Sequence, residues 1–237
     1  MKIRSSNSLM TVVAHPDDEV LGCGGTVHRL ISNGWKAHLT IMSGGVGGRY
    51  SRSEAAGAIA GKQKNALVEQ MQKAASAIGY HGVDVFDFPD NRMDTVGRMD
   101  LSQAIRPILE RERPDLVFTH HPGDYNWDHT AVFDAVMMAA RCNPPDFYPA
   151  EIRSFEVLSS TERAWQDSSR IFCPNLYVDI SKTIDMKKLA MRYYELEYRA
   201  YPHPRSIEAI EFLARRRGNE VGMIYAEAFH IIRALER

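Results

Sequence analysis

The sequence predicts an α/β protein with a Rossmann-like fold, in which a mostly parallel sheet carries helices on both faces and a C-terminal extension follows. Two observations predict this class. Short apolar runs alternate with segments of helical apolar spacing through the first 145 residues, and this alternation is typical of parallel sheets with crossover helices. Polar residues also follow each apolar run directly, which is where open α/β sheets bind their ligands.

The predicted core contains strands and helices in alternation. Each strand is a short apolar run, and the runs cover residues 9–14, 37–42, 83–88 and 116–119. Helices are expected at 20–32, 62–79, 100–113 and 130–141. The first three helices end at Asn33-Gly34, Gly79 and Pro114, which are residues that favour helix termination.

The C-terminal extension is less regular. Strands are expected at 152–158 and 176–180 and helices at 182–199 and 206–217, whereas 226–233 fits a strand or a short helix. We find no linker, repeat or low-complexity segment in the sequence. The chain is therefore expected to form one domain over residues 1–237, with a core of about 1–145 and an extension of about 146–237.

The composition is typical of a globular protein in water, since 44% of the 237 residues are hydrophobic and 25% are charged. A formal net charge of −1 gives no reason to expect a nucleic-acid or anionic membrane surface. The first residues lack the apolar stretch of a signal peptide, and no apolar run reaches the ~18 residues that span a bilayer. Three cysteines are too few for a disulfide framework, so a cytoplasmic location is expected.

Titratable side chains crowd the end of the first predicted strand, in the run Ala14-His15-Pro16-Asp17-Asp18-Glu19. Like charges repel at this spacing, and removing carboxylates from water is costly. A bound cation offsets both effects. Because His15 and Asp18 lie three residues apart on a turn, both can reach one ion, and the run predicts half of a metal site.

The other half is expected in the stretch His120–His129, which follows the fourth predicted strand. His129 begins a predicted helix, which would hold its ring firmly. Two histidines and one carboxylate, with a position left open for water, form a common catalytic zinc site. Zn²⁺ lowers the pKa of its water and polarises a carbonyl, and Asp17 can serve as general base and then as acid to a leaving amine. Iron, cobalt or nickel would also suit these ligands.

Structural roles compete with these assignments. A single Asp17 or Asp18 before a helix is more often an N-cap, but the whole cluster at a strand end favours a site. Asp128 is expected to cap the helix that follows it and can also orient a ligand or a substrate group. His120 and His121 each fit either a buried, hydrogen-bonded role or a direct chemical one.

At this point the chain resembles the LmbE/PIG-L family of zinc-dependent N-deacetylases. The resemblance rests on the run 14–19 and on Asp128-His129 after a Thr-His-His strand end. It extends over nearly the whole chain through phrases similar to one bacterial branch, which are Phe88–Asp94, Ser154–Val157, Tyr201–Ser206 and Ala226–Phe229. The resemblance implies removal of acetyl from N-acetylglucosamine-type sugars, with zinc bound by His15, Asp18 and His129 and with Asp17 as the base.

One departure from the family pattern concerns Asn126. Many members have His-Pro-Asp-His where this chain has Asn126-Trp127-Asp128-His129, and the resemblance implies that the first His of that motif stabilises an oxyanion. The Asn126 amide can donate a hydrogen bond to an oxyanion, but it cannot supply a proton. Either zinc and Asn126 suffice, or another histidine, His203 or His230, moves in.

Polar residues of the rim loops are candidates for substrate recognition, because charged and amide side chains suit hydroxyl and phosphate groups. Asp90-Asn91-Arg92 also fits a simple turn. Arg205, in the rigid segment Pro202–Arg205, fits either closure over the site or packing at a subunit interface. The predicted substrate-binding residues are Arg49, Asp90, Asn91, Arg92, Asp94, His121 and Arg205.

Two further patterns have structural interpretations. The glycines of Gly22-Cys23-Gly24-Gly25 are expected to permit close packing behind the metal loop. The run Arg215-Arg216-Arg217 ends a predicted helix, where positive charge suits the helix dipole, and is expected to be a solvated face.

These observations predict a metal-dependent hydrolase that removes the N-acetyl group from an N-acetylglucosamine-type sugar or sugar conjugate, with Asp17, Asn126 and Asp128 as catalytic residues. The alternatives are a hydrolase of another N-acyl group on a sugar or amino-acid conjugate, and a non-catalytic carbohydrate-binding relative. The expected partner is a small amino-sugar substrate, and the sequence leaves open whether it is nucleotide- or lipid-linked. No nucleic-acid partner and no membrane span are expected, and rigid proline-rich loops are compatible with a homo-oligomer.

Overall fold

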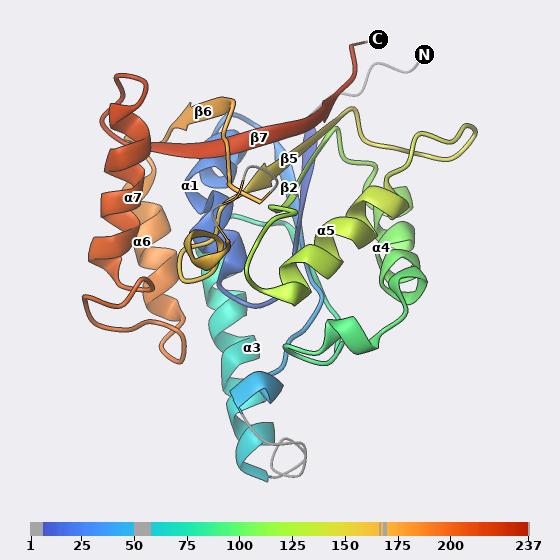
Figure 1. Ribbon diagram of the computed structural model, residues 1–237, viewed down its shortest axis with the longest axis horizontal. Helices are drawn as coiled ribbons and strands as arrows, with labels where there is room; N and C mark the ends of the chain where they lie inside the picture. Colours follow the sequence, from blue (N-terminus) through green and yellow to red (C-terminus); the bar gives the residue numbers. More distant parts are fainter. Residues whose placement is uncertain (1–6, 50–57, 166, 168–169, 237) are drawn as a thin grey trace.

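The described strands form one mixed sheet in the order β3-β2-β1-β4-β5-β7-β6 (Figure 1). The computed structural model describes residues 7–49, 58–165, 167 and 170–236. The strands are β1 (Ser8–Val13), β2 (Lys36–Ile41), β3 (Gly82–Val85), β4 (Leu116–His120), β5 (Glu151–Phe155), β6 (Leu176–Asp179) and β7 (Ala226–Ala234). The first five pair in parallel, and β7 pairs antiparallel with both β5 and β6.

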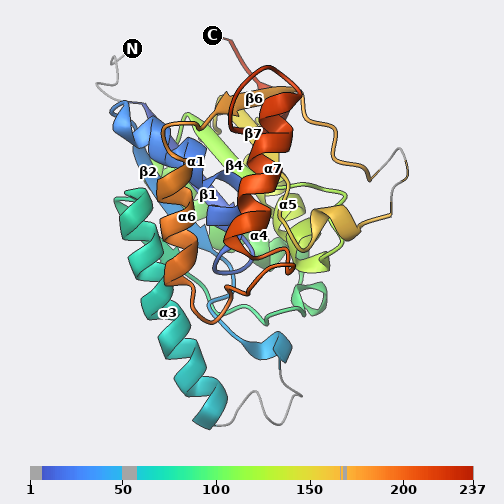
Figure 2. The ribbon, with the colours of Figure 1, turned by 90° about the vertical axis from the view of Figure 1, so that its left-hand side faces the viewer.

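Helices cover both faces of this sheet (Figures 1 and 2). One face carries α1 (Asp18–Ser32), α3 (Ala58–Ile78), α6 (Ile184–Tyr193) and α7 (Ile207–Asn219), and the other carries α4 (Arg98–Glu112) and α5 (Trp127–Ala139). Single 3-10 turns are η1 (Gly47–Arg49), η2 (Met93–Thr95) and η3 (Thr161–Arg163). Within the described residues, every helix is too short or too polar to cross a bilayer.

The pleat of β1 divides the apolar core into two layers. Leu9 and Val13 pack into the cluster under α1, α3 and α6, whereas Met10 and Val12 pack into the cluster under α4 and α5. Successive side chains of a strand point to opposite faces, so a continuous apolar run is what a strand buried on both faces requires. The predicted α/β class, with a mostly parallel sheet and helices on both faces, is confirmed.

Several predicted boundaries differ from the observed ones. The helix expected at 182–199 is shorter, since α6 ends at Tyr193, and Tyr194 then turns its hydroxyl inward to the buried Glu19 at 2.6 Å. The third strand ends at Val85 instead of residue 88, because the chain leaves β2 and makes an isolated bridge between Ser43 and Asp87. The ambiguous segment 226–233 is a strand, and the pairing with β5 and β6 selects that conformation.

Glycine allows α1 to lie against the sheet, as predicted. A Cβ at Gly22 would lie 2.2 Å from Cδ2 of the buried Phe155, and one at Gly25 would lie 3.0 Å from Ile180. The solvated face predicted for the arginine run is wrong at Arg217. Its guanidinium is buried and donates to both carboxylate oxygens of Glu156, at 2.6 and 2.7 Å, because α7 packs on the last strands of the sheet.

Candidate active site and metal centre

The loops that follow β1, β2, β3 and β4 meet at the carboxyl edge of the sheet. They enclose a cavity of about 190 Å³ together with two side chains of the C-terminal extension. Its polar and glycine lining is His15, Asp17, Gly45, Gly48, Asp90, Asn91, Asn126, Glu197 and Arg205. The cavity lies where β1 and β4 are neighbours and the strand order reverses, which is the usual ligand position in sheets of this topology.

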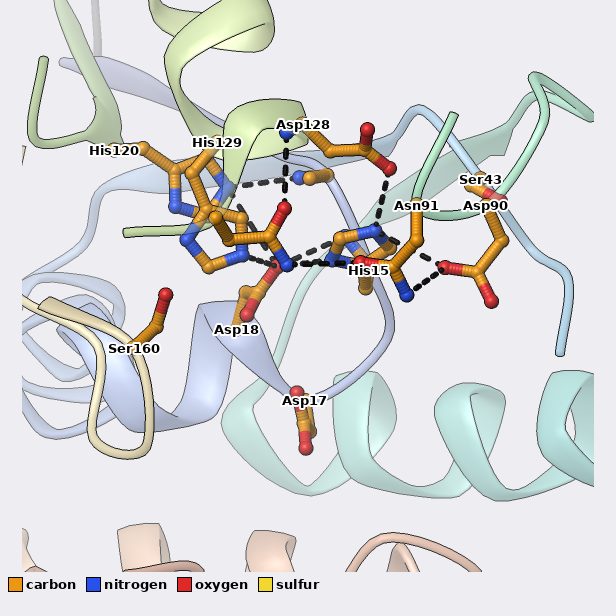
Figure 3. Close-up of polar contacts among 12 residues, drawn as sticks. His15, Asp17, Asp18, Ser43, Asp90, Asn91, His120, Asp128, His129 and Ser160 are labelled. Carbon is orange, nitrogen blue, oxygen red and sulfur yellow. Dashed lines mark hydrogen bonds and ion pairs between the residues drawn. The ribbon is translucent and has the colours of Figure 1, made fainter. Parts of the chain in front are cut away.

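Three potential metal ligands converge beside this cavity (Figure 3). Asp18 Oδ2 lies 3.5 Å from His15 Nδ1 and 3.4 Å from His129 Nε2. Donor atoms around a tetrahedral zinc ion, with bonds of ~2.0–2.1 Å, lie roughly 3.3 Å apart. The two nitrogens and the oxygen therefore fit a shared divalent ion.

The charges of this cluster also fit a cation. Burial raises the pKa of Asp18, but His129 and His15 outweigh burial and hold that pKa well below its usual value. Burial lowers the pKa of His129, yet the Asp18 and Asp124 carboxylates raise it to about 9. Without a metal, protons on the imidazoles balance the buried carboxylates, and a divalent ion would serve the same purpose.

Further carboxylates hold the two histidine rings. Asp128 Oδ2 lies 3.0 Å from His15 Nε2, and its Oδ1 accepts a hydrogen bond from the Met93 N–H at 2.9 Å. Asp124 Oδ2 lies 3.3 Å from His129 Nδ1. Carboxylates in these positions orient ligating imidazoles and increase their basicity.

Asp124 was not singled out from the sequence, although it precedes His129 by five residues in the same loop. Its carboxylate accepts hydrogen bonds from the hydroxyls of Ser160 and Thr161, the latter at 2.6 Å. Those two hydroxyls belong to the extension, so no local pattern around His129 reveals the network.

The N-cap predicted for Asp128 is wrong. Helix α5 begins at Trp127, and the N-cap is Asn126, whose Oδ1 accepts a hydrogen bond from the Asp128 N–H at 2.9 Å. The Asn126 Nδ2 donates to Asn91 Oδ1 at 3.2 Å, and Asn91 adopts a left-handed conformation with φ of 53°. These contacts fix the orientation of the Asn126 amide at the edge of the cavity.

Asp17 is buried and makes no capping hydrogen bond through its side chain. It occupies the N-cap position of α1 in a left-handed conformation with φ of 96°, and only 1% of its surface is exposed. Its Oδ2 has no hydrogen-bond partner among the described residues. Burial raises the pKa of Asp17 to about 7, and the main opposing influence is Arg205, whose Nε lies 3.5 Å away. Backbone strain of this kind is typical of functional sites.

A second part of the cleft adjoins the first across Asn91, Asn126 and Arg205. It encloses about 130 Å³, and its remaining lining is Tyr125, Trp127, His129, Val157, Ser159 and Ser160. Trp127 and Tyr125 are 56% and 62% exposed there. The Trp127 Nε1–H donates to the Asn91 carbonyl at 2.9 Å, which fixes the plane of the indole. The sequence analysis did not identify this aromatic edge.

Several predicted substrate-binding residues line the cleft, namely Asp90, Asn91 and Arg205. Asp90 links two loops, because its Oδ1 lies 3.2 Å from His15 Nε2 and its Oδ2 accepts the Gly48 N–H at 2.8 Å. Arg205 donates to Glu197 at 2.6 Å and to Ser159 at 3.1 Å.

Other predicted residues lie elsewhere. Arg92, Asp94 and His121 line neither part of the cleft, and His121 Nε2 lies 2.8 Å from the Arg170 carbonyl. The side chain of Arg49 lies outside the described residues. The assignment of these four to substrate binding stays a prediction.

The remaining histidines considered from the sequence have structural partners. His120 Nε2 accepts a hydrogen bond from the Ala14 N–H at 2.8 Å, and its ring stacks on His129. Burial lowers the pKa of His120 to about 3, so it is neutral. His203 accepts the Arg205 N–H, His230 contacts the Cys173 carbonyl, and neither lines the cleft.

The comparisons with known proteins agree in family. The family model described as PIG-L, GlcNAc-PI de-N-acetylase, matches residues 10–140. The uncharacterized deacetylase YaiS of Escherichia coli K12 is 28% identical over 141 residues, which are 57% of this chain and 69% of that protein. The 1D-myo-inositol 2-acetamido-2-deoxy-alpha-D-glucopyranoside deacetylase of Mycobacterium sp. strain JLS is 26% identical over 235 residues, covering 84% of this chain and 76% of that one.

Among solved structures, the N,N'-diacetylchitobiose deacetylase of Pyrococcus horikoshii matches with a TM-score of 0.76 and 20% identity. The match covers 96% of this chain and 84% of that one. Since the family model spans more than half of the 237 residues, this chain belongs to the PIG-L family, also called LmbE, of deacetylases.

Proposed function

We propose that the protein is a metal-dependent N-deacetylase that hydrolyses the acetamide of an N-acetylglucosamine-type sugar or sugar conjugate. One observation carries the proposal: the buried Asp17 carboxylate, with an unbonded oxygen, lines the same cavity as His15 and adjoins the Asp18 cluster. Relatives named as deacetylases of an inositol-linked acetamido sugar and of diacetylchitobiose support this substrate class.

In this proposal His15, Asp18 and His129 hold the metal ion. A bound zinc ion would acidify a water molecule and polarise the acetyl carbonyl. Asp128 and Asp124 keep the two imidazoles in position through their second ring nitrogens.

Asp17 is the proposed general base. It accepts a proton from water as the oxygen bonds to the acetyl carbon, and it returns that proton to the nitrogen as the C–N bond breaks, which gives acetate and a free amine. Burial suits both roles, because it brings the pKa of the carboxyl to about 7, near that of an effective proton carrier.

Asn126 is the proposed hydrogen-bond donor to the carbonyl oxygen as negative charge develops there. Its cap bond with Asp128 holds Oδ1 away from that role and leaves Nδ2 as the group available to a ligand. One Nδ2 hydrogen is used by Asn91, and an amide nitrogen carries two. A preoriented donor of this kind contributes about 3 kcal/mol to lowering an acyl-transfer barrier.

The test is acetate release from N-acetylglucosamine and N,N'-diacetylchitobiose by the metal-loaded protein, together with metal analysis. Chelation should abolish acetate release, and zinc should restore it. Asp17→Asn should keep the metal and lower kcat by about 10²–10⁴-fold. The matched control is Asp134→Asn, a half-exposed carboxyl on α5 that pairs with Arg98. Undiminished turnover in Asp17→Asn would exclude Asp17 as the base, and metal-loaded protein inert toward every acetamido sugar would favour the non-catalytic alternative.

A further inference from the structure

A second cluster of metal-ligating side chains lies at the opposite edge of the sheet from the cleft. His38 is near the start of β2, His81 directly precedes β3, and Glu112 is the last residue of α4. Three segments that are distant in sequence therefore end beside one another where the strands begin.

The distances in this cluster fit a shared ion. His38 Nδ1 lies 3.6 Å from Glu112 Oε1, and His81 Nε2 lies 3.2 Å from Glu112 Oε2. All three ligand atoms lie within 4.8 Å of one another. Donors around a tetrahedral zinc ion are roughly 3.3 Å apart, so small side-chain adjustments complete the geometry.

The tautomer of His38 is set by Asp84 on β3. Asp84 Oδ2 lies 2.8 Å from His38 Nε2 and places the ring proton on that nitrogen. The other nitrogen, Nδ1, then carries a lone pair, and it is buried with no hydrogen-bond partner among the described residues. The side chain as a whole is only 5% exposed.

A buried lone pair that faces a carboxylate requires a cation or a proton between them. Burial lowers the pKa of His38, which disfavours the proton. Gly82 leaves the space beside this nitrogen open, since a Cβ there would lie 2.7 Å from Nδ1. Asp84, His38 and the open nitrogen together have the carboxylate–histidine arrangement that orients imidazoles at zinc sites.

Arg111 compensates only part of the negative charge. Its guanidinium donates to Asp84 and to Glu112 Oε1, the latter at 2.7 Å. The other carboxylate oxygen of Glu112, Oε2, is the one that faces His81. With neutral histidines, two carboxylates and one guanidinium leave one net negative charge. Arg111 is also 53% exposed, so it can withdraw as an ion binds.

We propose that His38, His81 and Glu112 form a second metal site, which takes a first-row transition-metal dication such as Zn²⁺. Two imidazoles and a single carboxylate suit this class, whereas Mg²⁺ and Ca²⁺ prefer sites made of oxygen ligands. The bound ion would join the starts of β2 and β3 to the end of α4. Its role is structural, since it lies at the edge away from the cleft.

The experiment measures zinc bound per chain after equilibrium dialysis at micromolar free Zn²⁺, starting from His129→Ala, which removes a ligand of the proposed catalytic ion. We expect this variant to retain one zinc ion per chain. Adding Glu112→Gln should abolish that binding, and adding Glu110→Gln, a carboxyl on the same helix that pairs with Arg106, should not.

Thermal unfolding provides a second measurement that does not depend on catalysis. Zn²⁺ should raise the Tm of His129→Ala and of its Glu110→Gln partner, but not of the Glu112→Gln variant. His81→Ala, which changes a half-exposed side chain, replaces Glu112→Gln if that variant fails to fold. Absence of zinc from His129→Ala, or equal zinc in the Glu112→Gln and Glu110→Gln variants, would overturn the second site. Neither outcome bears on the deacetylase proposal, which depends on acetate release.

Discussion

Asp17 is a residue whose ionisation depends on its neighbours in space. Burial raises the pKa of this carboxyl to about 7, and the Arg205 guanidinium is the strongest influence in the opposite direction. Arg205 follows Asp17 by 188 positions in the printed sequence and is itself held by Glu197 and Ser159. The base and the cation that tunes it therefore come from opposite ends of the chain.

Removing that cation should shift the pH profile. A general base works only when unprotonated, so kcat/KM rises with pH through the pKa of Asp17. Arg205→Gln removes the group that lowers this pKa, and the acidic limb of the kcat/KM profile should move to higher pH, by about one unit. Arg98→Gln, a change at an exposed arginine on α4, should leave the limb in place. An unchanged or lowered limb in Arg205→Gln would contradict the pairing.

Trp127 is a residue whose exposure predicts a binding role. The indole is 56% exposed, fixed by its bond to the Asn91 carbonyl, and forms one wall of the outer part of the cleft. Aromatic faces of this kind pack against apolar faces of ligands.

Trp127→Ala should therefore raise KM for a two-ring substrate such as diacetylchitobiose by about tenfold, with a smaller effect on N-acetylglucosamine. Trp165→Ala serves as the control, because Trp165 is 78% exposed and lines neither part of the cleft. Equal effects of Trp127→Ala on both substrates would remove the case for stacking of the second ring.

At the scale of elements, α1 depends on close contact with β5. Gly22 faces the fully buried ring of Phe155, and a Cβ there would overlap with it, at 2.2 Å from Cδ2. This helix begins at Asp18, so its position against the sheet also determines where the carboxylates of the site lie.

Gly22→Ala should accordingly destabilise the protein by about 1–3 kcal/mol, because overpacking forces the ring or the helix to move. The comparison is Gly61→Ala in α3, where no atom lies within 4 Å of the added Cβ. That change should stabilise the protein by about 0.5–1 kcal/mol, since alanine favours helix. Chemical denaturation measures both, and a Gly22→Ala protein as stable as Gly61→Ala would contradict the close contact.

At the scale of the whole molecule, a buried ion pair joins the extension to the core. Lys187 of α6 and Glu227 of β7 lie 2.6 Å apart. Lys187 also donates to the Leu21 carbonyl at 2.8 Å, and Glu227 accepts the N–H groups of Gly25 and Thr26, at 3.0 and 2.7 Å. Two elements of the extension thus bond directly to the backbone in the middle of α1.

Lys187→Met should lower the free energy of unfolding by about 3–5 kcal/mol, because it leaves the Glu227 charge buried without a partner. Adding Glu227→Gln removes that charge but keeps an oxygen for the α1 backbone, so the double variant should recover part of the loss. Lys188→Met removes a lysine that pairs with Asp185 and Glu211, and it should cost less than about 1 kcal/mol. A loss in Lys187→Met no larger than in Lys188→Met, measured by urea unfolding, would show that the pair does not join the two parts.

Local patterns were sufficient for the order of the elements and for the candidate metal cluster. Apolar runs and helical spacing placed β1, β2 and β4 within a few residues, because burial on both faces requires such runs wherever the strands come to lie. The crowding of His15 and Asp18 after β1 indicated a cation site, because that crowding is unfavourable in any fold that buries it.

Only the tertiary structure decided which distant groups contact one another. Asp124 reaches His129 and accepts hydroxyls from η3, Arg205 approaches Asp17, and His38 faces Glu112. Each contact depends on strand order and side-chain direction, which long-range packing sets. The sequence by itself determined the chemistry of the individual residues and the periodicity of the elements, whereas the partners were decided by folding, since a pattern along the chain carries no distance between its separate parts.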